Sequence, residues 1–485
     1  MIAPEFESQA EAFHQEVYRE YYLAEAGFKE RLDITPIYER YSHLFSEPLV
    51  RELLTPAQTR QEGYVAEWVT LEHLEHVVKE LTERVSNEMR KATVDWDGKQ
   101  VSFHDLRPMM ANETDLGRRH RLDDLERGVT ATANPERAER LGYLHDKARE
   151  LGFQSYVELC DHLRSLSLDS LTQQIRALLD ATRVVFFQQL EPYLGDIAVS
   201  MDNARTCDIL ALFRGQRFDP LFPERSMIPA LASSLHGLGI DLATQANLEL
   251  DTEPRPLKTP RAFCVPIRIP QEVKLVTKPS GGPDDYESLL HEAGHAEHFV
   301  HVDPRLPFPF KRLGDNSVTE GYAFLLQYLL HSRHWLCRVL GIENSGDYLE
   351  HARFKKLWLL RRYASKLLYE QELHADLDGA QQRYVSILGG ALGVNIAPEN
   401  YLADTDDAFY CAQYLRAWIF EVQLRRFLED QFGREWFASL EAGNFLVSLW
   451  RRGQELRAEE LVREMGYADL DARYLIDELL AIQDD

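Results

Sequence analysis

Apolar residues recur at three- and four-residue spacing through most of this chain, and this pattern limits the possible folds more than any other feature. Between residues 68 and 92, seven such residues lie among charged ones: Val69, Leu71, Leu74, Val77, Val78, Leu81 and Val85. This spacing is typical of an amphipathic helix with one buried face. Similar patterns at 135–151, 155–165 and 171–194, and again from residue 317 onward, predict a mainly α fold.

One segment departs from the helical pattern. Between residues 254 and 283 proline is frequent, and the runs 262–269 and 272–277 show the alternation that is typical of strands. We expect a small antiparallel β ribbon here. Because this segment interrupts the helices, we expect an N-terminal helical lobe at 1–250 and a catalytic helical lobe at 251–485, joined in one continuous unit.

A metal-binding pattern follows the expected ribbon. The sequence His-Glu-Ala-Gly-His at 291–295 places two histidines four residues apart, and therefore on one face of a helix. Glu292 would lie beside the metal ion that they hold and could accept a proton from a metal-bound water. We expect the helix to start at a capping box formed by Asp284 and Glu287. A surface helix with incidental histidines is the alternative interpretation.

A catalytic zinc ion takes three protein ligands and keeps one position open, so a third ligand is needed. Glu320 is the candidate, because it lies 25 residues after His295 in the first turn of the next apolar helix. A competing interpretation is that Glu320 closes a capping box with Ser317 and only bonds its backbone. The mid-helix Gly294 favours close approach of a second helix at the metal, although a simple packing contact would explain it as well.

Composition restricts the partners and the compartment. The formal net charge of −25, from 54 basic and 79 acidic side chains, argues against a nucleic-acid surface. No run approaches the ~18 uninterrupted apolar residues of a membrane span, and the amino terminus lacks the apolar run of a secretory signal. The five cysteines are far apart, which fits a reducing compartment. We expect a cytoplasmic protein that binds neither nucleic acid nor membranes, and no sequence feature indicates an oligomeric state.

Four segments together resemble a known family. They are the residues Lys258–Cys264, His291–His298, Gly314–Glu320 and Phe409–Tyr414. Their sequences are similar to motifs of the thimet oligopeptidase and oligoendopeptidase F family of zinc metallopeptidases, which are gluzincins. The last segment, Phe-Tyr-Cys-Ala-Gln-Tyr, corresponds to the family's Phe-Tyr-x-x-Gln-Tyr block. The likeness is strong over about residues 255–320 and 400–430.

The resemblance implies a two-lobed helical metallopeptidase with a deep central cleft and the ribbon beside its active site. It implies that His291, His295 and Glu320 bind one Zn2+ per chain, and that Glu292 activates the zinc-bound water. The implied activity is hydrolysis of short, unstructured peptides, because a narrow channel excludes folded proteins. The ribbon could add a strand to the bound peptide.

The resemblance also implies a role for two tyrosines. Tyr410 and Tyr414 would face the metal and donate hydrogen bonds to the oxyanion or to the peptide backbone. Packing on a helix is the alternative for both. The chain departs from the family where a histidine usually precedes these tyrosines, since Asp404 and Thr405 stand there, and Ala417 replaces a tyrosine found in some members.

Two other functions remain open at this point. A zinc carboxypeptidase of the helical gluzincin type shares the His-Glu-x-Gly-His-Ala core and needs a cation for the substrate carboxylate, for which Arg416 and Arg361 are available. A catalytically weak peptide-binding protein on the same fold is the second, motivated by the missing histidine. The intact Glu292 argues against it, because a protein without activity needs no general base.

Overall fold

The computed structural model describes residues 4–55 and 59–481, and helices dominate it. The chain divides into two compact units, each built from separate segments. Unit 1 comprises Met1–Thr70, Gln216–Glu350 and Arg416–Tyr474, and unit 2 comprises Leu71–Gly215, His351–Leu415 and Leu475–Asp485. The predicted mainly α fold is confirmed.

This division differs from the predicted one at residue 250. Four helices each contain a boundary between the units: α4 (Arg60–Lys91), α17 (Gly346–Ala375), α19 (Tyr410–Phe432) and α22 (Ala472–Leu480). The change of sequence pattern near residue 250 instead marks strands inside unit 1. Proline and glycine indicate where a helix ends, but they do not indicate which distant segments pack together.

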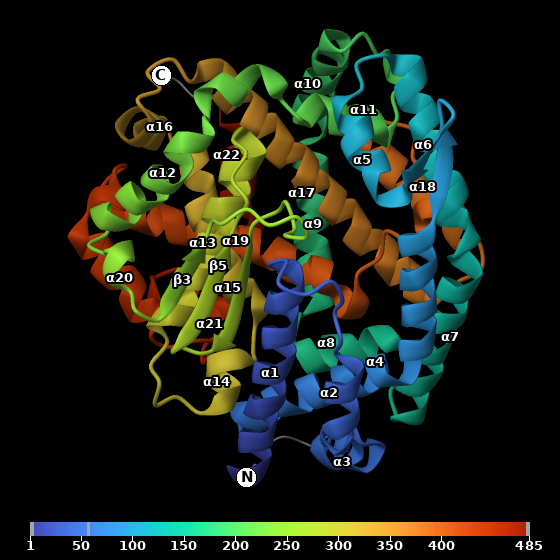
Figure 1. Cartoon of the computed structure of the whole chain (residues 1–485), viewed down its shortest axis with the longest axis vertical. Coiled ribbons are helices and arrows are strands. Elements are labelled where there is room, and N and C mark those ends of the chain that lie inside the picture. Colours follow the sequence, from blue (N-terminus) through green and yellow to red (C-terminus); the bar gives the residue numbers. More distant parts are fainter. Residues whose placement is uncertain (1–3, 56–58, 482–485) are drawn as a thin grey trace. The chain divides into compact units, whose positions relative to one another are not determined.

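Unit 1 contains ten further helices among the described residues. They are α1 (Pro4–Glu25), α2 (Thr35–Arg40), α3 (Glu47–Leu53), α12 (Glu224–Gly237), α13 (Pro283–His301), α14 (Phe308–Arg312), α15 (Asn316–Gln327), α16 (Arg333–Leu340), α20 (Leu440–Trp450) and α21 (Ala458–Glu464). Figure 1 shows α13 and α15, drawn in yellow, close to a small sheet and to α1. These elements carry the candidate site.

That sheet has three strands in the order β3-β5-β4, with bounds Leu248–Asp251 (β3), Phe263–Arg268 (β4) and Glu272–Val276 (β5). Strand β5 pairs antiparallel with β4 and parallel with β3. The predicted antiparallel ribbon is therefore confirmed, while β3 was not expected. Tyr22, in the last turn of α1, and Ala26, which directly follows this helix, pack against Val265 and Ile267 of β4. Helix α13 contacts β4 and β5.

Unit 2 is built mainly from consecutive helices. They are α5 (Phe103–Asn112), α6 (Leu116–Thr132), α7 (Asn134–Glu150), α8 (Tyr156–Arg164), α9 (Leu168–Ala181), α10 (Arg183–Asp196), α11 (Thr206–Phe213) and α18 (Ala380–Leu392), with a hairpin of β1 (Thr93–Trp96) and β2 (Lys99–Ser102). The apolar periodicity at 171–194 extends over two of these helices, because α9 ends and α10 begins on either side of Thr182. No helix in the described ranges is long and apolar enough to cross a membrane.

Candidate metal centre

Helix α13 carries the two histidines, and it begins differently from the prediction. Gly282, with φ of 90°, is its N-cap, and Pro283 occupies the first helical position. The carboxylate of Asp285 accepts hydrogen bonds from the N–H groups of Ser280 (2.6 Å) and Gly281 (2.9 Å). The predicted N-cap at Asp284 is therefore wrong, because proline at the first position starts the helix earlier without losing a hydrogen bond.

Helices α13 and α15 meet backbone to backbone beside the site. A Cβ atom added to Gly294 would lie 2.5 Å from the Cα of Ala323 and 2.6 Å from the carbonyl oxygen of Tyr322. Only glycine allows this approach. Of the two explanations for a mid-helix glycine, the close approach of the second helix is the one observed.

This approach brings three potential ligands together. The Nε2 atoms of His291 and His295 lie 3.4 Å and 3.6 Å from one carboxylate oxygen, Oε2, of Glu320. One ligand atom from each of these residues lies within 4.8 Å of those from the other two. Ligand atoms held about 2.1 Å from a tetrahedral zinc ion lie ~3.4 Å apart. Both the spacing and the chemistry of two imidazoles and one carboxylate therefore fit zinc.

The far ring nitrogens of the histidines are also held. Nδ1 of His291 lies 2.9 Å from Oε1 of Gln327, and Nδ1 of His295 lies 2.9 Å from the hydroxyl oxygen of Thr319. An amide oxygen only accepts, so Nδ1 of His291 carries the proton and Nε2 presents its lone pair. Neither Gln327 nor Thr319 was predicted from the sequence. The seven-residue spacing of Glu320 and Gln327 on α15 places them on one helix face and could have indicated Gln327, whereas Thr319 directly precedes Glu320 and carries no such signal.

The opposite charges of His295 and Glu320 shift the pKa of each group. Burial lowers the pKa of His295, but the negative charge of Glu320 outweighs this effect and raises the pKa above its usual value. Burial raises the pKa of Glu320, but the charges and hydrogen bonds of His295 and His291 hold it well below the usual range. A buried carboxylate that is stabilised by two imidazoles is a site where a divalent cation can replace protons.

The general-base candidate is oriented by the sheet. Oε2 of Glu292 accepts a hydrogen bond of 2.8 Å from the backbone N–H of Cys264 on β4. Glu292 and His291 are neighbours on α13, so this bond fixes the carboxylate beside the ligand cluster. The pattern of residues in the sequence predicted the position of Glu292 near the metal, but it contained no signal for this contact.

The competing interpretation of Glu320 as a helix cap does not hold. Asp315 is the N-cap of α15 and accepts from the N–H of Ser317 at 3.0 Å. Arg416 donates to both carboxylate oxygens of Asp315 at 2.8 Å, and it also reaches Glu459 at 2.7 Å. With Asp315 as the cap, the side chain of Glu320 is available to face the histidines.

The two predicted tyrosines lie in unit 2, in the first turns of α19. Their rings pack edge to face with centroids 5.1 Å apart, and the ring of Tyr414 lies 5.5 Å from that of Tyr363. Both are partly exposed, so they are not core residues. Their role in the reaction stays a prediction.

The segment where the resemblance leads one to expect a histidine is tied to unit 2. Asp404 accepts hydrogen bonds from Arg362 and, at 2.8 Å, from the hydroxyl of Tyr384. Thr405 donates to the carbonyl of Leu402 at 3.1 Å. A carboxylate only accepts hydrogen bonds, so Asp404 cannot replace a histidine as a donor.

His298 is not part of the ligand cluster. It is completely buried and packs against the ring of Tyr322, with centroids 5.1 Å apart. Burial lowers its pKa to about 3, so the ring is neutral. Core packing is the interpretation that this position favours.

Two other clusters among the described residues contain side chains that can bind a metal ion, and both lie in unit 2. In one, Nε2 of His120 bonds a carboxylate oxygen of Asp208 at 2.9 Å, and burial raises the pKa of the neighbouring Cys207 thiol well above its usual range. In the other, the thiol of Cys411 donates to Glu370 at 3.0 Å. Protonated thiols are poor metal ligands, so the cluster on α13 and α15 is the stronger candidate.

Comparisons with known proteins address the fold. No protein-family model matches the chain, and no curated protein does. A crystal structure of a candidate oligoendopeptidase F from Bacillus anthracis str. Ames is similar, with 15% identity and a TM-score of 0.67 over 97% of this chain and 88% of that chain. A second structure, of a candidate oligoendopeptidase F, has 14% identity and a TM-score of 0.70 over 98% and 90% of the two chains. The chain therefore has the fold of these structures.

Proposed function

We propose that this chain is a zinc-dependent peptidase that hydrolyses short, unstructured peptides. The observation that carries the proposal is the convergence of the His291 and His295 Nε2 atoms on one oxygen of Glu320, at 3.4 Å and 3.6 Å. The fold shared with structures described as candidate oligoendopeptidases supports it. That the substrates are short peptides is part of this proposal.

His291, His295 and Glu320 would hold the zinc ion. When bound, zinc would act as a Lewis acid that lowers the pKa of a water molecule and polarises the scissile carbonyl. Glu292 would accept a proton from the attacking water as the water oxygen bonds to the carbonyl carbon. The carbon–nitrogen bond then breaks, and Glu292 delivers the proton to the leaving amine. The N–H of Cys264 keeps the carboxylate of Glu292 oriented for both transfers.

Tyr410 and Tyr414 would donate phenolic hydrogen bonds to the carbonyl oxygen as it gains negative charge. Support comes from the continuity of α19, which begins with these tyrosines and continues to Arg416. Arg416 binds Asp315 in unit 1, five residues before Glu320. Within unit 1, the part of α19 that follows the tyrosines is therefore joined to the start of the helix that carries the third ligand.

The two arginines considered for the carboxypeptidase alternative are engaged in other contacts. Arg416 is buried and occupied by Asp315 and Glu459. Arg361 is also buried, and it donates to the carbonyls of Ala391 (3.0 Å) and Leu179 (2.7 Å). Neither is available for a substrate carboxylate, so endopeptidase action is the function that we propose.

The test is hydrolysis of internally quenched peptides of about ten residues by the purified zinc-loaded chain. We expect cleavage at internal bonds, equal rates for free and amidated carboxyl termini, and loss of activity on chelation that added zinc restores. A rate that disappears on amidation would support the carboxypeptidase instead. Absence of cleavage with one zinc ion bound would support a peptide-binding protein.

A further inference from the structure

We propose that a cavity beside strand β4 is a substrate subsite that receives a large apolar side chain, with a preference for an aromatic ring. The inference rests on the proposed peptidase function and adds a substrate class to it. The cavity has a volume of about 390 Å3 and lies entirely within unit 1, between the carboxyl half of α1 and the segment 259–265.

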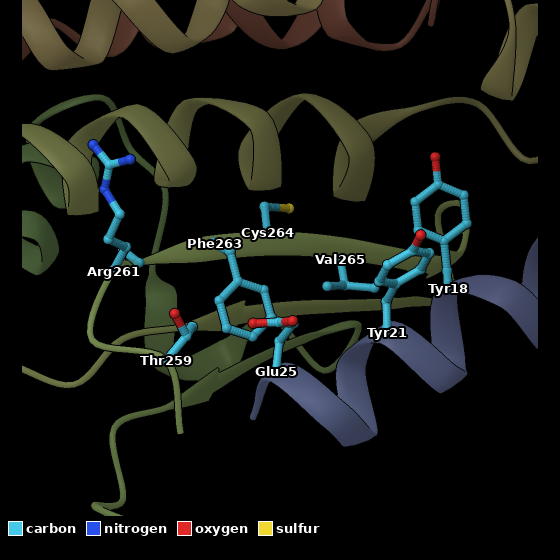
Figure 2. A pocket seen from close by; sticks show the side chains of 9 residues that line it. Tyr18, Tyr21, Glu25, Thr259, Arg261, Phe263, Cys264 and Val265 are labelled. Atoms are coloured by element: carbon cyan, nitrogen blue, oxygen red, sulfur yellow. The ribbon is translucent and has the colours of Figure 1, made fainter. Parts of the chain in front are cut away.

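Three of the nine residues that line the cavity are aromatic. Figure 2 shows Tyr18 and Tyr21 projecting from α1 at one end, while Phe263 lies below β4 near the middle. Tyr21 is partly open to solvent, with 37% of its surface exposed. One face of Tyr18 is already covered by Arg312, whose guanidinium carbon lies 4.9 Å from the ring centroid. Tyr21 is the most exposed of the three rings and offers the largest area to a ligand.

One residue contacts both the cavity and the candidate catalytic site. Cys264 lines the cavity, and its backbone N–H donates to the Glu292 carboxylate at 2.8 Å. In Figure 2 the side chains of Cys264 and Phe263 point to opposite sides of β4. A peptide segment whose scissile bond lies at Glu292 would thus place a neighbouring side chain against this cavity.

The strand order favours an extended occupant. Strand β4 is at the edge of the sheet, because β5 pairs with it on one side and the order is β3-β5-β4. An extended peptide beside an edge strand sends alternate side chains to opposite faces. The face that carries Phe263 is the one on which α1 packs, since Val265, two residues along β4, contacts Tyr22 and Ala26.

The charged residues at the cavity favour an apolar occupant over a charged one. Glu25 and Arg261 both line it, and both are exposed. They carry opposite charges and are solvated, so their effects on a charged side chain oppose each other. Among apolar side chains, an aromatic ring is favoured because it buries a large apolar area and can pack edge to face or offset against the rings of the cavity.

The experiment measures kcat/KM for a series of quenched peptides in which one position at a time carries Phe, Leu, Ala, Lys or Glu. At one position close to the scissile bond we expect Phe to exceed Ala roughly tenfold or more, the usual discrimination of an apolar pocket. Tyr21→Ala should reduce this ratio towards one, and Tyr21→Phe should retain it. Tyr143→Ala removes an exposed tyrosine of α7 in unit 2 and is the matched control, which should leave the ratio unchanged.

Binding separates this inference from the proposed function. The affinities of Phe and Ala peptides are measured by fluorescence anisotropy with the Glu292→Gln variant, with and without Tyr21→Ala. A Phe preference that depends on Tyr21 supports the subsite even if the wild-type chain cleaves no peptide, which would refute only the proposed function. A preference for Lys that disappears in Glu25→Gln, a preference for Glu that disappears in Arg261→Gln, or a Phe/Ala ratio unaffected by Tyr21→Ala would overturn the subsite.

Discussion

Gly294 of α13 faces Ala323 of α15 so closely that an added Cβ atom would lie 2.5 Å from the Cα of Ala323. The separation of the two helices sets the distance between the histidines and Glu320. We predict that Gly294→Ala pushes the helices apart and weakens zinc binding by at least tenfold, measured by competition with a chelator. Gly128→Ala is the control, because its Cβ would meet no atom within 4 Å, and alanine in mid-helix stabilises by up to about 1 kcal/mol. Equal zinc affinities for the two variants would contradict the prediction.

Glu292→Gln should separate metal binding from chemistry. Glutamine keeps the shape and can still accept from the N–H of Cys264, but it cannot take a proton from water. We predict an unchanged content of one zinc ion per chain and a kcat lower by roughly three orders of magnitude or more. The exposed Asp284 on the same helix provides the control, and Asp284→Asn should retain full activity. Near-normal hydrolysis by Glu292→Gln would remove Glu292 from the mechanism.

The partners of the histidine Nδ1 atoms should tune the affinity for the metal. Gln327→Leu and Thr319→Val each remove one hydrogen-bond partner, at 2.9 Å in both cases. Loss of such a partner typically weakens metal binding about 10- to 100-fold. Gln327→Glu and Thr319→Ser keep an oxygen in place and should retain most of the affinity. The comparison of zinc dissociation constants for the two pairs checks this, and equal losses within a pair would show that the hydrogen bond has no role.

Asp315 and Arg416 should stabilise the start of α15 through their buried ion pair. Burial raises the pKa of Asp315, but the charge and hydrogen bonds of Arg416 outweigh it and lower the pKa to about 2. Because the folded pKa is below that of the unfolded chain, this stabilisation is complete above about pH 4 and is lost as the pH falls through about 2.

We predict that Asp315→Ala, which leaves Arg416 buried without this partner, lowers the free energy of unfolding at pH 7 by about 3–5 kcal/mol. Glu47→Ala removes the exposed partner of Arg51 and should cost at most about 0.5 kcal/mol. Denaturant titration at pH 7 measures both values. Similar small losses for the two variants would contradict the assignment.

The sequence was sufficient to predict the elements that carry short-range signals. The four-residue spacing of His291 and His295 predicted that they share a helix face. The alternation of apolar and polar residues on either side of Pro270 predicted the pairing of β4 with β5. In each case residues close together in the chain determine the geometry.

Contacts between distant segments were not predictable in the same way. The ion pair that holds the cap residue Asp315 comes from Arg416, which is 101 residues away. The bond from Cys264 to Glu292 and the cavity between α1 and β4 likewise join segments that share no local pattern. The boundary expected at residue 250 differs from the observed units for the same reason, because packing joins segments from both halves of the chain.

His291, His295 and Glu320 are proposed to hold one zinc ion beside Glu292. The most direct test is anomalous diffraction from crystals of the zinc-loaded chain, recorded on both sides of the zinc absorption edge. We predict a single strong peak about 2.0–2.2 Å from Nε2 of each histidine and from a carboxylate oxygen of Glu320. No peak at this position, or a peak at another group of residues, would contradict the account.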